Sequence, residues 1–167
     1  GICYEVKTLP GIEESYPDTL SGEEIPVFIA CEKADAYRQT MHSDELIITA
    51  DTIVWLDGLV MGKPEDEEDA RRMLRCLSGK THQVITGVCL TTTEFQKSFA
   101  TVTDVTFAEL TEEEIDYYVQ KYKPMDKAGS YGIQEWIGFV GVEGITGSYF
   151  NVMGLPIQRL YKELKKL

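Results

Sequence analysis

The sequence predicts an α/β fold in which a mixed β-sheet is covered by helices. Segments with apolar residues at helical spacing are interleaved along the chain with apolar runs rich in β-branched residues. Some of these runs are joined by hairpins, which is typical of a mixed sheet with helical cover. No linker, repeat or low-complexity tract divides the 167 residues, so we expect one domain.

The first predicted helix and strand occupy the first third of the chain. Pro26 opens a helix in which apolar residues recur at helical spacing as far as Met41. Residues 46–56 are apolar and rich in β-branched side chains, which predicts a buried strand. Asp57-Gly58 then suits a tight hairpin turn.

A second helix and two long strands are expected next. The helix follows Pro64, and its acidic first turns and later arginines match the helix dipole. Gly79 stands where a C-terminal cap belongs. Residues 81–91 and 98–107 have the apolar pattern of strands, the second with alternating large side chains on one face.

The last third is expected to hold two more helices with short strands between them. Thr111 begins a capping box and a helix that runs to about Tyr122. Residues 136–142 and 148–153 are predicted to be short strands within a glycine-rich region. An amphipathic helix over 155–167 closes the chain.

Composition excludes several classes of partner. The chain has 16 Lys and Arg against 28 Asp and Glu, a net charge of −12. Nucleic acids and anionic membranes bind clustered positive charge, so neither is expected as a partner. No apolar run is long enough to span a bilayer. The four widely spaced cysteines indicate reduced thiols in a cytoplasmic protein, with a disulfide scaffold as the alternative.

Two familiar kinds of catalytic chemistry do not fit the spacing of the residues. Ser78-Gly79-Lys80-Thr81 resembles the end of a phosphate-binding P-loop, but Leu74 stands where that motif needs a glycine. A helix C-cap that leads into a strand is the better interpretation. His42 and His82 lie on separate segments and are expected at the surface or a sheet edge, so a histidine-based triad is not predicted.

Several charged residues occupy positions where regular elements favour apolar ones. Asp51 interrupts the apolar strand, and a buried carboxylate needs a metal, a cation or backbone amides; an Asp that caps a turn is the alternative. Lys33 lies near the apolar stripe of the first helix, and Lys63 at a hairpin exit; each could instead be a solvated lysine.

A further charged pair, Asp126-Lys127, belongs to a loop of small residues over 124–134. Small residues let the backbone approach a ligand closely, although a plain surface loop is the alternative. Carboxylates and lysines in an otherwise acidic protein suit a polyphosphate substrate that carries a divalent cation. The carboxylates would hold the metal, and the lysines would contact phosphate oxygens.

Five blocks of the sequence resemble the Maf family, septum-formation-inhibitor-like proteins that act as nucleoside triphosphate pyrophosphatases. Their order and separations extend across nearly the whole chain. The blocks are Ala50-Asp51-Thr52-Ile53-Val54, Gly62-Lys63-Pro64, Leu77-Ser78-Gly79-Lys80-Thr81-His82, residues 126–134 and residues 147–156.

The resemblance implies a fold like that of the inosine triphosphate pyrophosphatases, a long mixed sheet that forms two lobes around a cleft. It also implies hydrolysis of a nucleoside triphosphate to the monophosphate and pyrophosphate, with Mg²⁺ or Mn²⁺ as cofactor. Residues 1–167 would form one Maf-like domain. The family opens with a strand and a Ser-x-Ser-Pro-Arg-Arg loop, which the 167 residues lack. Either the encoded protein has this segment ahead of Gly1, or the segment is absent.

The resemblance assigns roles to individual residues. Asp51 matches the family's proton acceptor and is a candidate metal ligand. Glu14, in a Glu-Glu pair where the family has Asp-Glu, is the second candidate metal ligand. Lys33 matches the lysine of the A-x-x-K-A helix and Lys63 that of G-K-P, and both would neutralise phosphate charge. Asp126 and Lys127 complete the predicted substrate-binding set.

Two further residues bear on the choice of base. The Asp51-Thr52 step and the 131–134 loop resemble the subfamily that acts on dTTP and UTP, not the 7-methyl-GTP subfamily. The amide of Gln134 offers both a donor and an acceptor to a pyrimidine edge, with Thr52 as its companion.

A second function stays open beside the enzyme. Because the chain lacks the Ser-x-Ser-Pro-Arg-Arg loop, it could be a catalytically weak, nucleotide-binding regulator of septum formation and cell division. Nucleotide binding without hydrolysis would mark that alternative. The resemblance also implies a homodimer, for which the sequence gives no independent sign.

Overall fold

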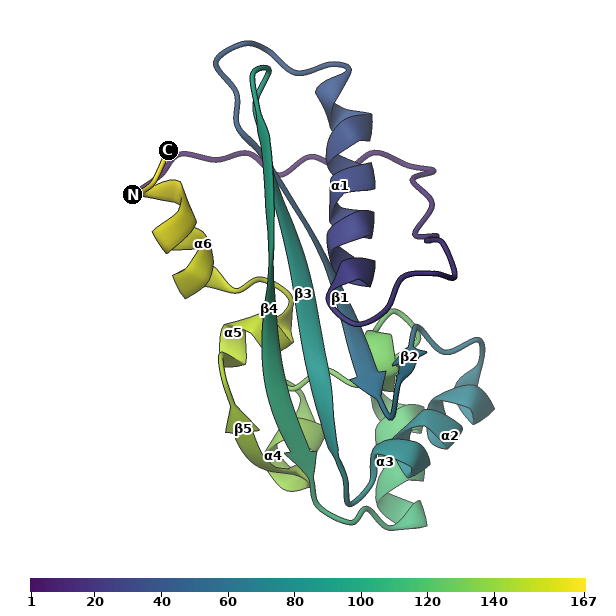
Figure 1. The fold of residues 1–167 in the computed structure, drawn as a ribbon. Helices are drawn as coiled ribbons and strands as arrows, with labels where there is room; N and C mark the ends of the chain where they lie inside the picture. The colour runs from purple at the N-terminus through teal and green to yellow at the C-terminus, as the bar shows by residue number, and fades with distance from the viewer.

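The computed structural model describes residues 1–167 and builds them around one five-stranded sheet with the order β2-β1-β3-β4-β5 (Figure 1). All four neighbouring pairs are antiparallel. The α/β fold with a helix-flanked sheet is therefore confirmed, whereas the expected mixed sheet is wrong in this chain. The strands are β1 (Ile47–Leu56), β2 (Leu59–Met61), β3 (Thr81–Thr91), β4 (Gln96–Phe107) and β5 (Val142–Thr146).

The brevity of β2 explains why the sheet is antiparallel where a helix connects its strands. Because β2 has only three residues, it ends close to the end of the sheet where β1 finishes, and the chain continues from there. Helix α2 (Glu67–Leu77) packs at that same end (Figure 1), so β3 starts there and runs back along β1. A crossover to the far end would have been needed for a parallel pair.

Besides α2, the helices are α1 (Glu24–Arg38), α3 (Glu112–Tyr122), the single 3₁₀ turn η1 (Ala128–Ser130), α4 (Trp136–Gly141), α5 (Tyr149–Met153) and α6 (Ile157–Leu164). Four of the helices, α1, α2, α3 and α6, match the strongly periodic segments of the sequence. No helix is long and apolar enough to cross a membrane.

The strand predicted over 148–153 is a short helix, α5. The hydroxyl of Ser148 accepts a hydrogen bond from the backbone N–H of Asn151, which caps its start. Gly154 ends the helix with a φ of 120°. The aromatic residues of this segment favour a strand, but its capping residues at both ends decide for a helix.

The strand predicted over 136–142 is also wrong, because this segment forms α4 and only its last residue begins β5. Ile137 and Gly141, four positions apart, are buried, whereas Phe139 and Val140 are exposed. Burial therefore follows the period of a helix and not the alternation of a strand.

The two faces of the sheet are covered differently. Helix α1 packs on the face that presents Ile53, Ile85 and Cys89. The opposite face carries two separate apolar cores. A cluster of 16 residues lies with α2 and α3 at one end, and a smaller cluster around Leu160 of α6 lies at the other. Figure 1 shows α2 and α3 at one end of the sheet and α6 beside its other half.

A band of polar side chains crosses the sheet between the two cores. Fully buried Asn151 donates hydrogen bonds to the carbonyls of Val84 and Thr101, at 3.2 and 3.1 Å, and to the hydroxyl of Thr103 at 2.9 Å. The hydroxyls of Thr52 and Thr86 are 2.8 Å apart. This polar band separates the two apolar cores, which accounts for the predicted division into two lobes.

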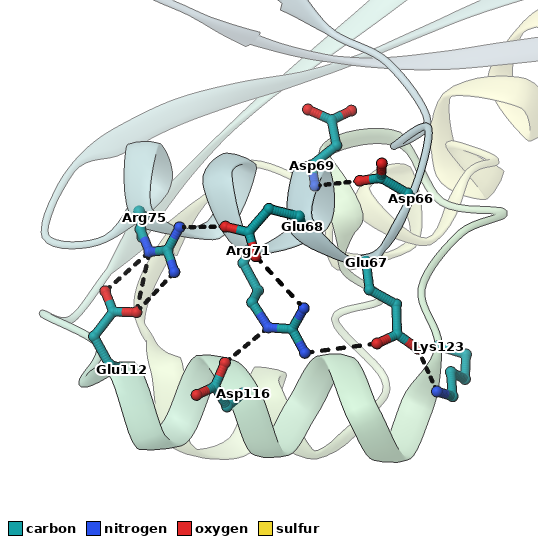
Figure 2. A network of polar contacts seen from close by, with 9 residues as sticks. All are labelled: Asp66, Glu67, Glu68, Asp69, Arg71, Arg75, Glu112, Asp116 and Lys123. Atoms are coloured by element: carbon teal, nitrogen blue, oxygen red, sulfur yellow. Dashed lines mark hydrogen bonds and ion pairs between the residues drawn. The ribbon is translucent and has the colours of Figure 1, made fainter.

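Ion pairs join α2 to α3 (Figure 2). Arg71 Nε lies 2.7 Å from Asp116, and the guanidinium of Arg75 contacts both carboxylate oxygens of Glu112 at 3.0 Å. Lys123, just after α3, pairs with Glu67. Water screens the exposed members of these pairs, so the pairs orient α3 on α2 more than they stabilise the fold.

Helix α1 lies directly on β3, because Gly87 has no side chain. A Cβ at this position would come within 2.5 Å of the Pro26 carbonyl oxygen and closer still to the backbone nitrogen of Val27. Gly87 is also the register partner of Asp51. Helix α1 therefore packs closely on the sheet next to Asp51, the carboxylate that the sequence singles out.

We expect Gly87→Ala to lower the free energy of unfolding by about 1–3 kcal/mol, because backbone atoms of α1 must move to admit the methyl group. Urea denaturation measures this change. Gly144→Ala is the matched control, since a Cβ there meets nothing within 4 Å. Equal stability of the two variants would show that α1 does not depend on this contact.

Candidate active site

A cleft of about 300 Å³ opens beside β1, along the stretch that β2 leaves uncovered. The strand pairs with β2 only from Val54 onward, so Ile47–Ile53 form an open edge. All eight residues that the sequence singles out line this one cleft, although their individual roles stay predictions. They are Glu14, Lys33, Asp51, Thr52, Lys63, Asp126, Lys127 and Gln134.

The ammonium group of Lys33 lies between two carboxylates. Its Nζ atom is 3.2 Å from Asp51 Oδ1, 3.2 Å from Glu14 Oε1 and 3.3 Å from the carbonyl oxygen of Ala50. Lys63 Nζ is 3.7 Å from the other oxygen of Glu14. Lys33 comes from α1, Asp51 from β1 and Glu14 from the segment before α1, so tertiary packing alone brings these charges together.

The two carboxylates differ in environment. Asp51 is only 9% exposed, and burial raises its pKa above the ordinary value against the opposing charge of Lys33. Burial also acts to raise the pKa of Glu14, but the ammonium groups of Lys33 and Lys63 outweigh it and lower that pKa. Burial thus favours the protonated form of Asp51, whereas the two lysines favour the ionised form of Glu14.

A loop tied to the end of β2 forms the second wall. The N–H of Gly129 donates to the carbonyl of Gly62, 3.1 Å away, which links this loop to the residue before Lys63. Gly129 has a φ of 68° and packs against Val54, where a side chain would not fit. Lys127 Nζ lies 3.1 Å from Asp126 and 3.7 Å from Glu135.

Thr52 and Gln134 stand apart from the charged group. The hydroxyl of Thr52 is 3.5 Å from the carbonyl oxygen of Gly154, at the end of α5. Gln134 is exposed, on the turn that leads into α4. Met153 and Gly154 line the cleft with them. The cleft therefore has a charged part and a less charged part.

His82 is not at the surface as expected. It is 2% exposed, and its Nε2 atom lies 2.6 Å from the hydroxyl of Tyr131, whereas His42 is exposed as predicted. Burial lowers the pKa of His82 to about 4, so the ring is neutral at pH 7. Tyr131 also lines the cleft, although its position in the sequence indicates no role for its side chain. Only the alternation of faces along β3 could have indicated that His82 points inward.

The donor set of the cleft fits a divalent cation that shares its ligands with a substrate. No group of three or more His, Cys, Asp or Glu side chains gathers in the structure as a complete metal cage. Glu14 and Asp51 nevertheless flank one cationic group, the ammonium of Lys33. Mg²⁺ is commonly held by one or two carboxylates, water and substrate phosphates, which matches this pair.

The sequence of this chain is similar to those of known proteins along its whole length. A family model described as "Maf-like protein" matches residues 1–167. Proteins named "dTTP/UTP pyrophosphatase" are 80% identical in Phocaeicola vulgatus and 71% identical in Bacteroides fragilis, both over 167 residues, with 100% of this chain and 86% of each relative covered. The one in Porphyromonas gingivalis is 53% identical over 166 residues, with 98% and 83% covered.

We expect Asp51→Asn to raise the stability of the metal-free protein at pH 7. Burial raises the pKa of Asp51, so the wild type loses stability as pH rises from the unfolded-state pKa of about 3.9 through the raised folded-state value. Asparagine carries no charge, and Lys33 keeps Glu14 as its partner. Urea denaturation between about pH 4 and pH 7 measures the widening difference.

Asp44→Asn, in an exposed loop, is the control for that comparison. A constant difference between the wild type and Asp51→Asn across the pH range would contradict the prediction.

Proposed function

This chain belongs to the Maf-like family, and from that premise we propose that it hydrolyses dTTP and UTP to the nucleoside monophosphate and pyrophosphate. One observation carries the proposal: Glu14, Lys33, Asp51 and Lys63 meet in one cleft, with Gln134 in the same cleft. We assign residues 1–167 to one catalytic domain in the cytoplasm, and the homodimer stays a prediction.

Lysine side chains are the proposed ligands of the triphosphate. Lys33, Lys63 and Lys127 line the cleft of a protein whose net charge is −12. A triphosphate would take the place of carboxylates as their partner and gain charge-assisted hydrogen bonds. Local cations of this kind are needed because the acidic remainder of the protein repels a polyanion.

Asp51 is the proposed proton acceptor. Its raised pKa makes it a stronger base than an exposed aspartate, and Lys33 favours the ionised form that accepts a proton. Water attacks phosphorus, the bond to the pyrophosphate leaving group breaks, and the proton released from the water goes to Asp51. Each turnover consumes one water and yields one monophosphate and one pyrophosphate.

Glu14 and Asp51 are the proposed protein ligands of Mg²⁺ or Mn²⁺, with phosphate oxygens of the substrate as further ligands. When bound, the cation would neutralise charge on the transferring phosphoryl group. Asp126, on the loop that forms the second wall of the cleft, is proposed to orient Lys127 through their 3.1 Å ion pair.

Gln134 and Thr52 are proposed to read the base. Thymine and uracil present the same hydrogen-bonding edge and differ only by the 5-methyl group. An amide that donates and accepts on that edge therefore treats dTTP and UTP alike. Cytosine reverses the donor and the acceptor at N3 and at the exocyclic 4-position, so dCTP would leave polar groups unpaired.

We expect Asp51→Asn to reduce pyrophosphate release from dTTP and UTP by about a hundredfold or more, because general base catalysis is lost. The full encoded protein is assayed with Mg²⁺ or Mn²⁺ against a panel of nucleoside triphosphates, with Asp44→Asn as the control. Retained dTTP binding shows that the cleft is intact. A wild type that binds nucleotide and releases no pyrophosphate would favour the regulator of septum formation instead.

We expect Gln134→Ala to lower kcat/KM for dTTP and UTP together by roughly tenfold, with little change for dCTP, because the shared edge loses its partner. Steady-state kinetics with the three nucleotides measure this. A loss confined to dTTP would contradict recognition of the shared edge, since only the 5-methyl group distinguishes the two bases.

A further inference from the structure

The loop that carries Gln134 is fastened to the protein by the hydroxyl group of one buried tyrosine. Tyr118, on α3, is fully buried. Its hydroxyl accepts a hydrogen bond from the N–H of Gly132 at 3.1 Å and donates one to Glu135 Oε1 at 2.8 Å. These two residues lie on either side of Gln134 in the sequence. The backbone that presents the amide is thus held both before and after it.

Tyr118 is itself held in a fixed place. It belongs to the 16-residue core, and its ring stacks on that of Tyr122 with a centroid distance of 5.1 Å. The ion pairs between α2 and α3 orient the helix that carries it (Figure 2). A buried backbone N–H such as that of Gly132 is costly to leave unpaired, so the hydrogen bond to the hydroxyl is strongly favoured.

Tyr131, the residue before Gly132, is held by contacts of its own. The hydroxyl of Tyr131 lies 2.6 Å from Nε2 of buried His82, and the ring of Phe107 packs edge-on against both. In contrast, Gln134 is exposed. The loop therefore combines a fixed backbone with one free side chain, which is the arrangement a recognition residue needs.

Glu135 extends this connection toward the charged part of the cleft. It lies 3.7 Å from Lys127 Nζ, and the Lys127 side chain passes over Gly132, where a Cβ would come within 2.8 Å of Lys127 Cε. Tyr118 does not line the cleft. Any effect of its hydroxyl on a nucleotide must therefore pass through the loop.

We propose that Tyr118 is a positioning residue for base selection, whose hydroxyl holds residues 132–135 so that the Gln134 amide faces the pyrimidine edge. This proposal rests on the proposed function, in which Gln134 reads the base. It adds a residue of the α3 core to the determinants of specificity.

Tyr118→Phe tests the proposal, because it removes the hydroxyl and keeps the ring. We expect KM for dTTP and UTP to rise about tenfold, the effect of about one lost hydrogen bond, with kcat changed less than about twofold. The preference for dTTP over dCTP should fall by a similar factor. Tyr122→Phe is the matched control, since its ring stacks on Tyr118 and its hydroxyl holds no part of the loop. An unchanged dTTP preference in Tyr118→Phe would overturn the proposal.

A double-mutant cycle separates positioning from general stability. If Tyr118 acts through Gln134, Tyr118→Phe should have no further effect on base preference in the Gln134→Ala background. Multiplicative losses would overturn the proposal. Glu135→Gln keeps an acceptor for the hydroxyl and should retain the preference, whereas Glu135→Ala should weaken it; equal behaviour of these two variants would also count against the proposal.

Binding measurements distinguish failure of this proposal from failure of the proposed function. Calorimetric titration with dTTP and dCTP in the Asp51→Asn background, where turnover is strongly reduced, reports base preference with little hydrolysis. No preference for dTTP without the Tyr118 change would refute the proposed function and, with it, the role of Tyr118. A preference that persists unchanged in Tyr118→Phe would refute the role of Tyr118 alone.

Discussion

The close contact of α1 with β3 is the constraint on which the cleft depends. Gly87 has no side chain, so the first turn of α1 lies on the strand directly beside Asp51. Only at this distance can Lys33 reach the carboxylate at 3.2 Å and, with the same ammonium group, Glu14. A bulkier residue at position 87 would lift the helix and separate these charges. The electrostatics of the site thus rest on a packing detail of an apolar interface.

The open edge of β1 explains how two unlike environments share one cleft. Successive residues of a strand point to opposite faces. Asp51 points toward α1 and its charges, while Thr52 points toward the polar band and α5. In the interior of a sheet these side chains would be separated by the backbone layer. At an edge that β2 leaves uncovered, both line the same cavity, so the charged part and the less charged part meet around one strand.

Different interactions hold the two parts of the cleft in place. Long, partly exposed side chains of opposite charge make up the α1 side, and their partners can be exchanged for a polyanion at small cost in packing. Buried hydroxyl groups fix the opposite wall, where Tyr118 and Tyr131 hold the loop backbone against the core. This contrast matches the tasks proposed for them, since charge neutralisation tolerates mobility and the reading of a base edge does not.

The chain alone predicts the strongly periodic helices and the long strands. Charges in or beside regular elements and small residues in a loop are local signals, and they single out Lys33, Asp51, Lys63, Asp126 and Lys127. The family resemblance is needed to add Glu14, Thr52 and Gln134. The chain alone does not predict that 136–141 and 149–153 are helical, since their apolar content favours strands and only caps and burial decide otherwise. The antiparallel sheet, the burial of His82 and the Glu14–Lys33–Asp51 contact are likewise decided by tertiary structure. Each depends on which distant segments pack together, and a pattern within one segment carries no information about its partner.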